Sequence, residues 1–224
     1  MQENIEETEN EKSNRENNRF TYLALGDSYT IGESVETSQR YPVLLVNRLR
    51  QVGYSVSDPV IVARTGWTTD ELAAGITASG VTGPFDLVSL LIGVNNQYRG
   101  RDVDTYRTEF CALLQQAVDF AGGKAEKVFV LSIPDWGVTP FAASWDREKI
   151  AREIDQYNAV NREETCKRGI LYVDVTPVSR QALEDPSLIA EDGLHPSGKM
   201  YAAWVERALP GVIRILNQGK TTTP

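Results

Sequence analysis

Five short apolar segments alternate with helical patterns along this chain, and that alternation constrains the fold more than any other feature of the sequence. The segments occupy residues 20–25, 60–63, 85–92, 128–133 and 170–175. The third segment is almost continuously apolar, which is typical of a central strand that is buried on both faces. The stretches between the segments carry apolar side chains at helical spacing. Strands separated by helices predict βαβ units, a parallel sheet and right-handed crossovers.

We therefore predict an α/β fold for residues 19–217, in the form of one three-layer α/β/α sandwich. Its five-stranded parallel sheet is expected to have the flavodoxin-like strand order 2-1-3-4-5, the natural arrangement for five such strands. The two ends of the chain differ from this domain. Residues 1–18 contain six Glu, five Asn and a single aliphatic residue, Ile5. Such a segment buries too little apolar surface to offset its ordering entropy, so a disordered tail is predicted there, and residues 218–224 are expected to form a second, frayed tail.

Composition excludes several classes of function. The chain has 31 acidic and 23 basic side chains, a net charge of −8, which argues against a general nucleic-acid binder. No apolar run approaches the roughly 18–20 residues of a membrane-spanning helix, so no integral membrane segment is expected. Cys111 and Cys166 are the only cysteines and form no CxxC motif, which excludes a zinc finger or a disulfide framework. With a single histidine, His195, and unpaired cysteines, no metal site is predicted.

The beginning of the chain bears on its location. Residues 1–4 have no basic start and no apolar segment follows, so the chain as given carries no secretion signal. A cytoplasmic protein is the default expectation. The alternative is an exported or periplasmic mature form, in which residues 1–18 serve as a tether.

Candidate functional residues lie in the loops that follow the predicted strands. Ligands of open parallel sheets bind at the carboxyl ends of the strands, and in the order 2-1-3-4-5 the loops after the first three strands are neighbours. These loops carry Ser28, Gly66 and Asn95. The loop after the fifth strand contains Asp192 and His195 and must return over the same edge to begin the last helix. All five residues are therefore expected to converge on one crevice.

This set of residues suits nucleophilic catalysis on an ester. A serine hydroxyl becomes a good nucleophile when a base takes its proton, and His195 is the only histidine that can do so. Asp192, three residues earlier, is placed to hold the imidazole tautomer. The oxyanion formed by attack needs preorganised donors. The candidates are the backbone N–H groups of Ser28 and Gly66 and the side-chain amide of Asn95, and a glycine suits a close approach of the backbone to substrate.

Four segments resemble the conserved blocks of the SGNH hydrolases, the GDSL-like lipases and esterases. The segments are Gly26-Asp27-Ser28-Tyr29, the residue Gly66, Gly93-Val94-Asn95-Asn96 and Asp192-Gly193-Leu194-His195. The resemblance implies a flavodoxin-like sheet and hydrolysis of acyl esters without a metal or cofactor. It assigns Ser28 as the nucleophile and Asn95 as an oxyanion donor. Two positions depart from the family pattern: Tyr29 replaces the usual leucine, and Asn96 stands where aspartate is more common, which changes a supporting hydrogen bond.

The predicted function is that of a serine esterase acting on a small-molecule acyl ester through an acyl-enzyme. Trp67 and Trp136 follow the second and fourth strands, and each either walls the acyl or alcohol pocket or packs in the core. Three alternatives remain open: an acyltransferase using the same site, a catalytically inactive ligand-binding module, and a flavin-binding electron carrier holding a phosphate at a helix N-terminus. The identity of the ester is not readable from the sequence, because fold does not determine substrate.

Overall fold

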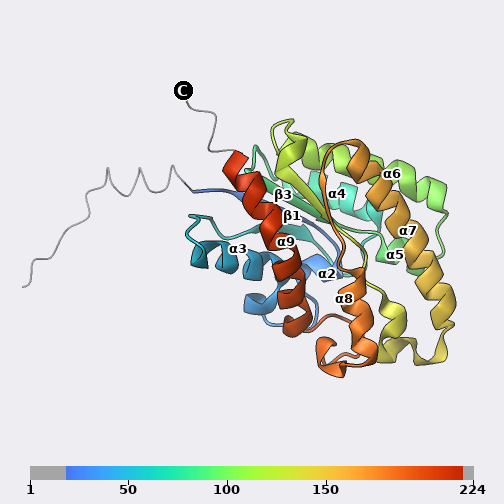
Figure 1. Cartoon of the computed structure of the whole chain (residues 1–224). Helices are drawn as coiled ribbons and strands as arrows, with labels where there is room; N and C mark the ends of the chain where they lie inside the picture. Colours follow the sequence, from blue (N-terminus) through green and yellow to red (C-terminus); the bar gives the residue numbers. More distant parts are fainter. Residues whose placement is uncertain (1–18, 219–224) are drawn as a thin grey trace, which may run out of the picture.

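A computed structural model describes residues 19–218 of the 224-residue chain (Figure 1). Its five strands form one parallel sheet in the order β2-β1-β3-β4-β5, which confirms the predicted topology. The strands are β1 (Tyr22–Gly26), β2 (Val60–Ala63), β3 (Leu87–Leu91), β4 (Val128–Leu131) and β5 (Leu171–Val173). In the centre of the sheet, Leu25 pairs with Val62 on one side and with Leu90 on the other.

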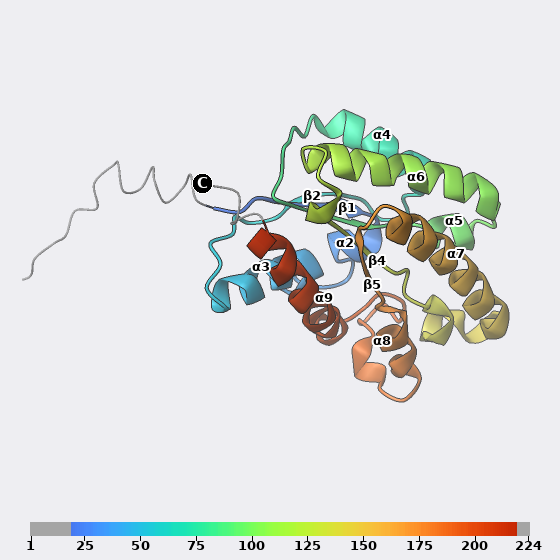
Figure 2. The same ribbon diagram turned by 45° about the horizontal axis from the view of Figure 1, so that its top comes forward.

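Helices cover both faces of the sheet, which gives the predicted three layers. The longer helices are α3 (Tyr41–Gln51), α4 (Thr69–Ser79), α6 (Val103–Phe120), α7 (Arg147–Lys167) and α9 (Gly198–Gln218). Figures 1 and 2 show α3 and α9 together on one face, and α4, α6 and α7 on the other. Three short helices follow strands: α2 (Ser28–Ile31) after β1, α5 (Val94–Tyr98) after β3 and α8 (Thr176–Arg180) after β5.

The core lies between the sheet and its helices. Strands β1 and β3 are buried along their whole length, as expected for central strands covered on both faces. On the α3–α9 side, Trp204 is fully buried, and its ring lies 5.0 Å from that of Tyr201 and 6.4 Å from that of Tyr41. Full burial of a large apolar side chain contributes about 1.5–3 kcal/mol to folding. This aromatic packing supports α9, and the loop before α9 carries His195.

The carboxyl end of β1 turns sharply into α2, and Gly26 permits the turn. A Cβ atom at residue 26 would lie 2.1 Å from Thr30 Oγ1 and 2.4 Å from the Leu91 carbonyl oxygen. Any larger residue would therefore push α2 away from the neighbouring strand. The close approach places Ser28, the first residue of α2, at the edge of the sheet.

Two predictions about the ends of the chain concern residues that the structure does not describe, namely the tails at residues 1–18 and 219–224. Gln218, which the sequence analysis placed in the second tail, is the last residue of α9. Both cysteines are unpaired. Within residues 19–218, none of the helices combines the length and the apolar character needed to cross a bilayer.

Candidate active site

Ser28 is presented by a tight turn between β1 and α2. Asp27 caps this short helix, since its Oδ1 accepts a hydrogen bond from the Tyr29 amide at 3.0 Å. Burial, opposed in part by that amide, raises the pKa of Asp27 to about 7. The helix ends at Gly32, whose φ of +71° is a left-handed conformation that favours glycine. Asp27 therefore acts on the local backbone, and the Ser28 side chain is left to face the carboxyl edge of the sheet.

His195 and Asp192 lie on the loop that leads into α9 and contact each other directly. The imidazole Nδ1 lies 2.6 Å from Asp192 Oδ2, while Asp192 Oδ1 accepts hydrogen bonds from the backbone amides of Leu194 and His195, both at 2.9 Å. Ser34 Oγ donates to Oδ2 at 2.7 Å. Burial acts to raise the pKa of Asp192, but these hydrogen bonds outweigh it and hold the pKa well below the usual range of a carboxyl.

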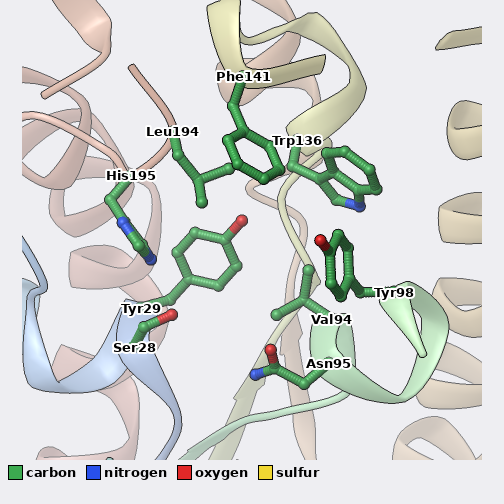
Figure 3. Close-up of a pocket in the computed structure, with 9 residues that line it drawn as sticks. All are labelled: Ser28, Tyr29, Val94, Asn95, Tyr98, Trp136, Phe141, Leu194 and His195. Atoms are coloured by element: carbon green, nitrogen blue, oxygen red, sulfur yellow. The ribbon is translucent and has the colours of Figure 1, made fainter. Parts of the chain in front are cut away.

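The ionised carboxylate determines the imidazole tautomer. A carboxylate only accepts hydrogen bonds, so the proton of neutral His195 resides on Nδ1. The lone pair is then on Nε2, the nitrogen that faces the pocket in Figure 3. Tyr29 supports this orientation, because its ring meets the imidazole edge-on with the centroids 5.8 Å apart. A proton acceptor therefore faces the side of the pocket where Ser28 lies.

The loops after β2 and β3 are tied together beside this pair. Gly66 has a φ of +86°, which favours glycine, and its carbonyl accepts a hydrogen bond from Arg99 Nη2 at 2.7 Å. The next carbonyl, that of Trp67, accepts from Asn95 Nδ2 at 2.9 Å. Because an amide nitrogen carries two hydrogens, this bond orients the Asn95 side chain and leaves the second N–H for a ligand.

Ser28, Asn95 and His195 line one pocket, with a cavity volume of about 210 Å³. The full lining comprises Ser28, Tyr29, Val94, Asn95, Tyr98, Trp136, Phe141, Leu194 and His195 (Figure 3). Trp136 thus lies at the pocket, which is one of the two positions that the sequence left open for it. Gly66 and Trp67 are not among the lining residues. The Trp67 ring packs instead on Gly75 of α4, where a Cβ would come within 2.0 Å of it.

An aromatic wall forms the side of the pocket, and most of it was not predicted. Tyr98 comes from α5, Trp136 from the short helix η3 (Trp136–Val138) and Phe141 from η4 (Pro140–Ser144). The Trp136 centroid lies 5.4 Å from Tyr98, 6.0 Å from Phe141 and 5.4 Å from Trp145. Aromatic residues concentrated after the third and fourth strands were the available sequence signal.

Hydrogen bonds hold the buried member of this wall. The Trp136 indole N–H donates to Gln97 Oε1 at 2.8 Å, and Gln97 Nε2 donates to Glu153 on α7 at 2.7 Å. Trp136 is buried, whereas Tyr98, Phe141 and Trp145 are exposed at the rim. The wall is therefore preorganised at its base and open to solvent at its edge.

Comparison with known proteins places the chain in a family. A model of the GDSL-like lipase/acylhydrolase family matches residues 24–203. The chain belongs to this family. The resemblance to the SGNH hydrolases seen in the sequence is thereby confirmed. No curated protein matches the chain in sequence.

Solved structures share the fold of this GDSL-like protein. TesA has a TM-score of 0.69 at 21% identity, with 88% of this chain and 99% of TesA covered. The psychrotrophic esterase EstA from Pseudoalteromonas sp. has a TM-score of 0.66 at 15% identity, covering 88% and 98%. The acetylxylan esterase Axe2 from Geobacillus stearothermophilus has a TM-score of 0.61 at 20% identity, covering 88% and 94%. At these identities the likeness shows the fold alone.

Asn96, which stands where this family more often has aspartate, bonds the helix that contains Asn95 to the start of α4. It is fully buried, and its Oδ1 accepts from the Thr69 amide at 3.1 Å. Its Nδ2 donates to Thr69 Oγ1 at 2.6 Å, and that hydroxyl donates in turn to Glu109. Both ends of the Asn96 side-chain amide are therefore hydrogen-bonded. Its NH₂ group suits the Thr69 hydroxyl oxygen, because the hydrogen of that hydroxyl is donated to the Glu109 carboxylate.

Asn96→Asp is expected to destabilise the fold by about 1–3 kcal/mol, because a buried donor is lost and the Thr69 hydroxyl then faces two carboxylates. Chemical unfolding monitored by circular dichroism measures the change. Glu109→Gln in the same chain supplies a new donor to Thr69 and should restore most of the loss. Equal stability of Asn96→Asp and the wild type would contradict this account of the site.

Proposed function

We propose that this chain is a serine esterase that hydrolyses small acyl esters, with Ser28 as the nucleophile. One observation carries the proposal: Ser28, Asn95 and His195 line the same pocket, and Asp192 holds the Nδ1 atom of that histidine. Membership of a lipase/acylhydrolase family supports an ester substrate. The shared fold with an esterase and an acetylxylan esterase is consistent with the same reaction class.

In the first half of the proposed reaction, Ser28 Oγ attacks the carbonyl carbon of the ester. The new Oγ–C bond forms as the hydroxyl proton passes to His195 Nε2, and the carbonyl π electrons move to the oxygen. The free N–H of Asn95 Nδ2 serves as a donor to this oxyanion. Ser28 adds its own backbone N–H, which as the first residue of α2 has no partner within the helix.

Collapse of the tetrahedral intermediate breaks the bond to the alcohol. His195 gives the proton from Nε2 to the departing alcohol oxygen, and Ser28 is left as an acyl ester. Water then repeats the sequence: His195 takes its proton, its oxygen attacks the acyl carbon, and the proton returns to Ser28 Oγ as the acid leaves. Asp192 remains ionised throughout and stabilises the imidazolium in both halves.

The geometry of the pocket suggests which end of the ester meets the aromatic wall. The alcohol oxygen must lie within reach of His195, because that residue protonates it. Figure 3 shows His195 on one side of the pocket, and Tyr98 and Trp136 on the opposite side. The acyl group therefore extends toward the aromatic wall. No Asp, Glu, Lys or Arg side chain lines the pocket, so it suits an uncharged, apolar acyl group.

Labelling with a fluorophosphonate tests the proposal without knowledge of the natural ester. One structure of EstA, which shares the fold, is of the enzyme inhibited by monoethylphosphonate. We expect a single adduct, mapped to Ser28 by intact mass and peptide analysis. His195→Ala should abolish it, because the hydroxyl is then not activated. An adduct on another residue, or none on folded protein, would contradict the proposal.

Asn95→Ala is expected to lower kcat for ester hydrolysis by about 100- to 1,000-fold, the usual effect of removing one oxyanion donor. KM should change little, because the charge develops in the transition state. Asn95→Asp keeps the shape of the side chain and should be more damaging, since it replaces a donor with negative charge. Steady-state kinetics of both variants measure the effect, and an unchanged kcat in Asn95→Ala would remove this residue from the mechanism.

A further inference from the structure

A second, much smaller cavity adjoins the pocket that contains Ser28. Its volume is about 10 Å³, enough for no more than one water molecule. The two cavities share Tyr29, Trp136 and Leu194 in their linings. The rest of its lining comes from the segment after β4, from α8, and from α9 and the loop before it: Pro134, Asp135, Thr139, Ser179, Ile189, Pro196 and Met200. The shared side chains therefore separate the substrate pocket from further space within the fold.

Tyr29 is the member of this partition that follows the nucleophile directly. Its side chain is only 3% exposed, and its ring meets His195 at 5.8 Å and Trp204 at 6.3 Å, both edge-on. Figure 3 shows the ring between His195 and Val94 in that view, with its hydroxyl directed away from Ser28. Contacts on two sides prevent the ring from swinging aside. An acyl chain that is too long for the 210 Å³ pocket must therefore displace this ring or extend into solvent.

We propose that Tyr29 determines acyl-chain length: its ring closes the inner end of the pocket and restricts the enzyme to short acyl groups. This inference rests on the proposed esterase function and adds a substrate class to it. The Gly-Asp-Ser-Leu motif that gives the family its name has leucine after the serine, and here a flat aromatic ring takes that place. A smaller, flexible side chain at residue 29 would join the two cavities and admit a longer chain.

Chain-length profiles of matched variants test the proposal. The kcat/KM values of p-nitrophenyl esters from acetate to dodecanoate are measured for the wild type, Tyr29→Leu, Tyr29→Ala and Tyr29→Phe. The wild type should prefer short chains. Tyr29→Leu and Tyr29→Ala should move the optimum to longer chains, with a gain of about fourfold for each further buried methylene. Tyr29→Phe keeps the ring and should keep the wild-type profile.

Met200 provides a control from the other side of the partition. It lines the small cavity and not the substrate pocket. Met200→Ala enlarges the inner space but leaves the ring in place, so alone it should not alter the profile. Combined with Tyr29→Leu it should extend the accepted chain beyond that of Tyr29→Leu. A profile that is unchanged in Tyr29→Leu and Tyr29→Ala, or that shifts equally in Met200→Ala alone, overturns the proposal.

A binding measurement separates this inference from the proposed chemistry. Straight-chain carboxylic acids of increasing length are titrated by calorimetry into Ser28→Ala and Ser28→Ala/Tyr29→Leu, which need no catalysis. Affinity should stop rising at a shorter chain in the first protein than in the second. If esters are not hydrolysed by the wild type but this difference is found, the esterase proposal fails and the role of Tyr29 stands. If Ser28 is labelled but neither measurement responds to Tyr29, only the role of Tyr29 fails.

Discussion

Ser28→Ala is expected to lower kcat for ester hydrolysis by about 10⁴- to 10⁶-fold, the effect of removing a nucleophilic serine from a comparable triad. The substitution removes one oxygen atom and retains the backbone of the turn. The Ser28 carbonyl accepts hydrogen bonds from the amides of Gly32 and Glu33, and alanine keeps both. The melting temperature should therefore remain close to that of the wild type, so a loss of rate reports on chemistry. Steady-state kinetics with a p-nitrophenyl ester and thermal unfolding measure the two quantities.

Combination with a second variant tests whether Ser28 acts with His195. Residues that function as one unit are strongly non-additive: once one is lost, removing the other has little further effect. Ser28→Ala/His195→Ala should therefore be about as slow as either single variant. Multiplicative losses would indicate independent roles, and a Ser28→Ala protein with near wild-type kcat would place the nucleophile elsewhere.

Asp192→Asn is expected to lower kcat by about 10⁴-fold, as replacement of the aspartate by asparagine does in a comparable triad. The asparagine oxygen can still accept from the Leu194 and His195 amides, which Asp192 Oδ1 now does. Its nitrogen would face His195 Nδ1 and force that atom to become the acceptor. The imidazole proton then moves to Nε2, where it blocks proton transfer from Ser28. Steady-state kinetics measure the loss, and proton NMR of the single histidine distinguishes the two tautomers.

Ser34→Ala is the matched control for Asp192→Asn. Ser34 donates to the same carboxylate oxygen that receives His195 Nδ1, at 2.7 Å. Its removal deletes one hydrogen bond to Asp192 but leaves the charge and the tautomer unchanged, so kcat should fall only slightly. If Ser34→Ala were as damaging as Asp192→Asn, hydrogen bonding within the loop and not the tautomer would account for the loss.

The layers of the fold could be predicted because they depend on local patterns. A run such as residues 85–92 is almost continuously apolar, and a strand covered on both faces buries such a run. The strand order came from the preference of five-stranded βαβ folds and is confirmed. The short turns were not predicted. Helices α5, η3 and η4 have too few residues for a periodic pattern, and their conformation depends on what surrounds them.

In the candidate site, too, some features were predictable from the sequence and others were not. Asp192 and His195 are three residues apart in one turn, so their contact follows from local geometry and was predictable. The sequence also determined that any imidazole base must be His195 and that the residues after β1 and β3 meet at one edge. Only the tertiary structure decided the lining of the pocket. The sequence left the same two possibilities open for Trp67 and Trp136, yet the Trp67 ring packs on Gly75 and Trp136 lines the pocket.

The physical reason is the range of the interactions involved. Strand and helix formation depend on neighbours along the chain, and a parallel sheet brings its carboxyl ends together whatever the loops contain. The direction of a loop side chain depends on contacts with residues far away in the sequence. Trp136 is held by Gln97, and Tyr29 by His195 and Trp204. The sequence by itself therefore determined the fold class and the candidate catalytic residues, and the tertiary structure decided the shape of the pocket beside them.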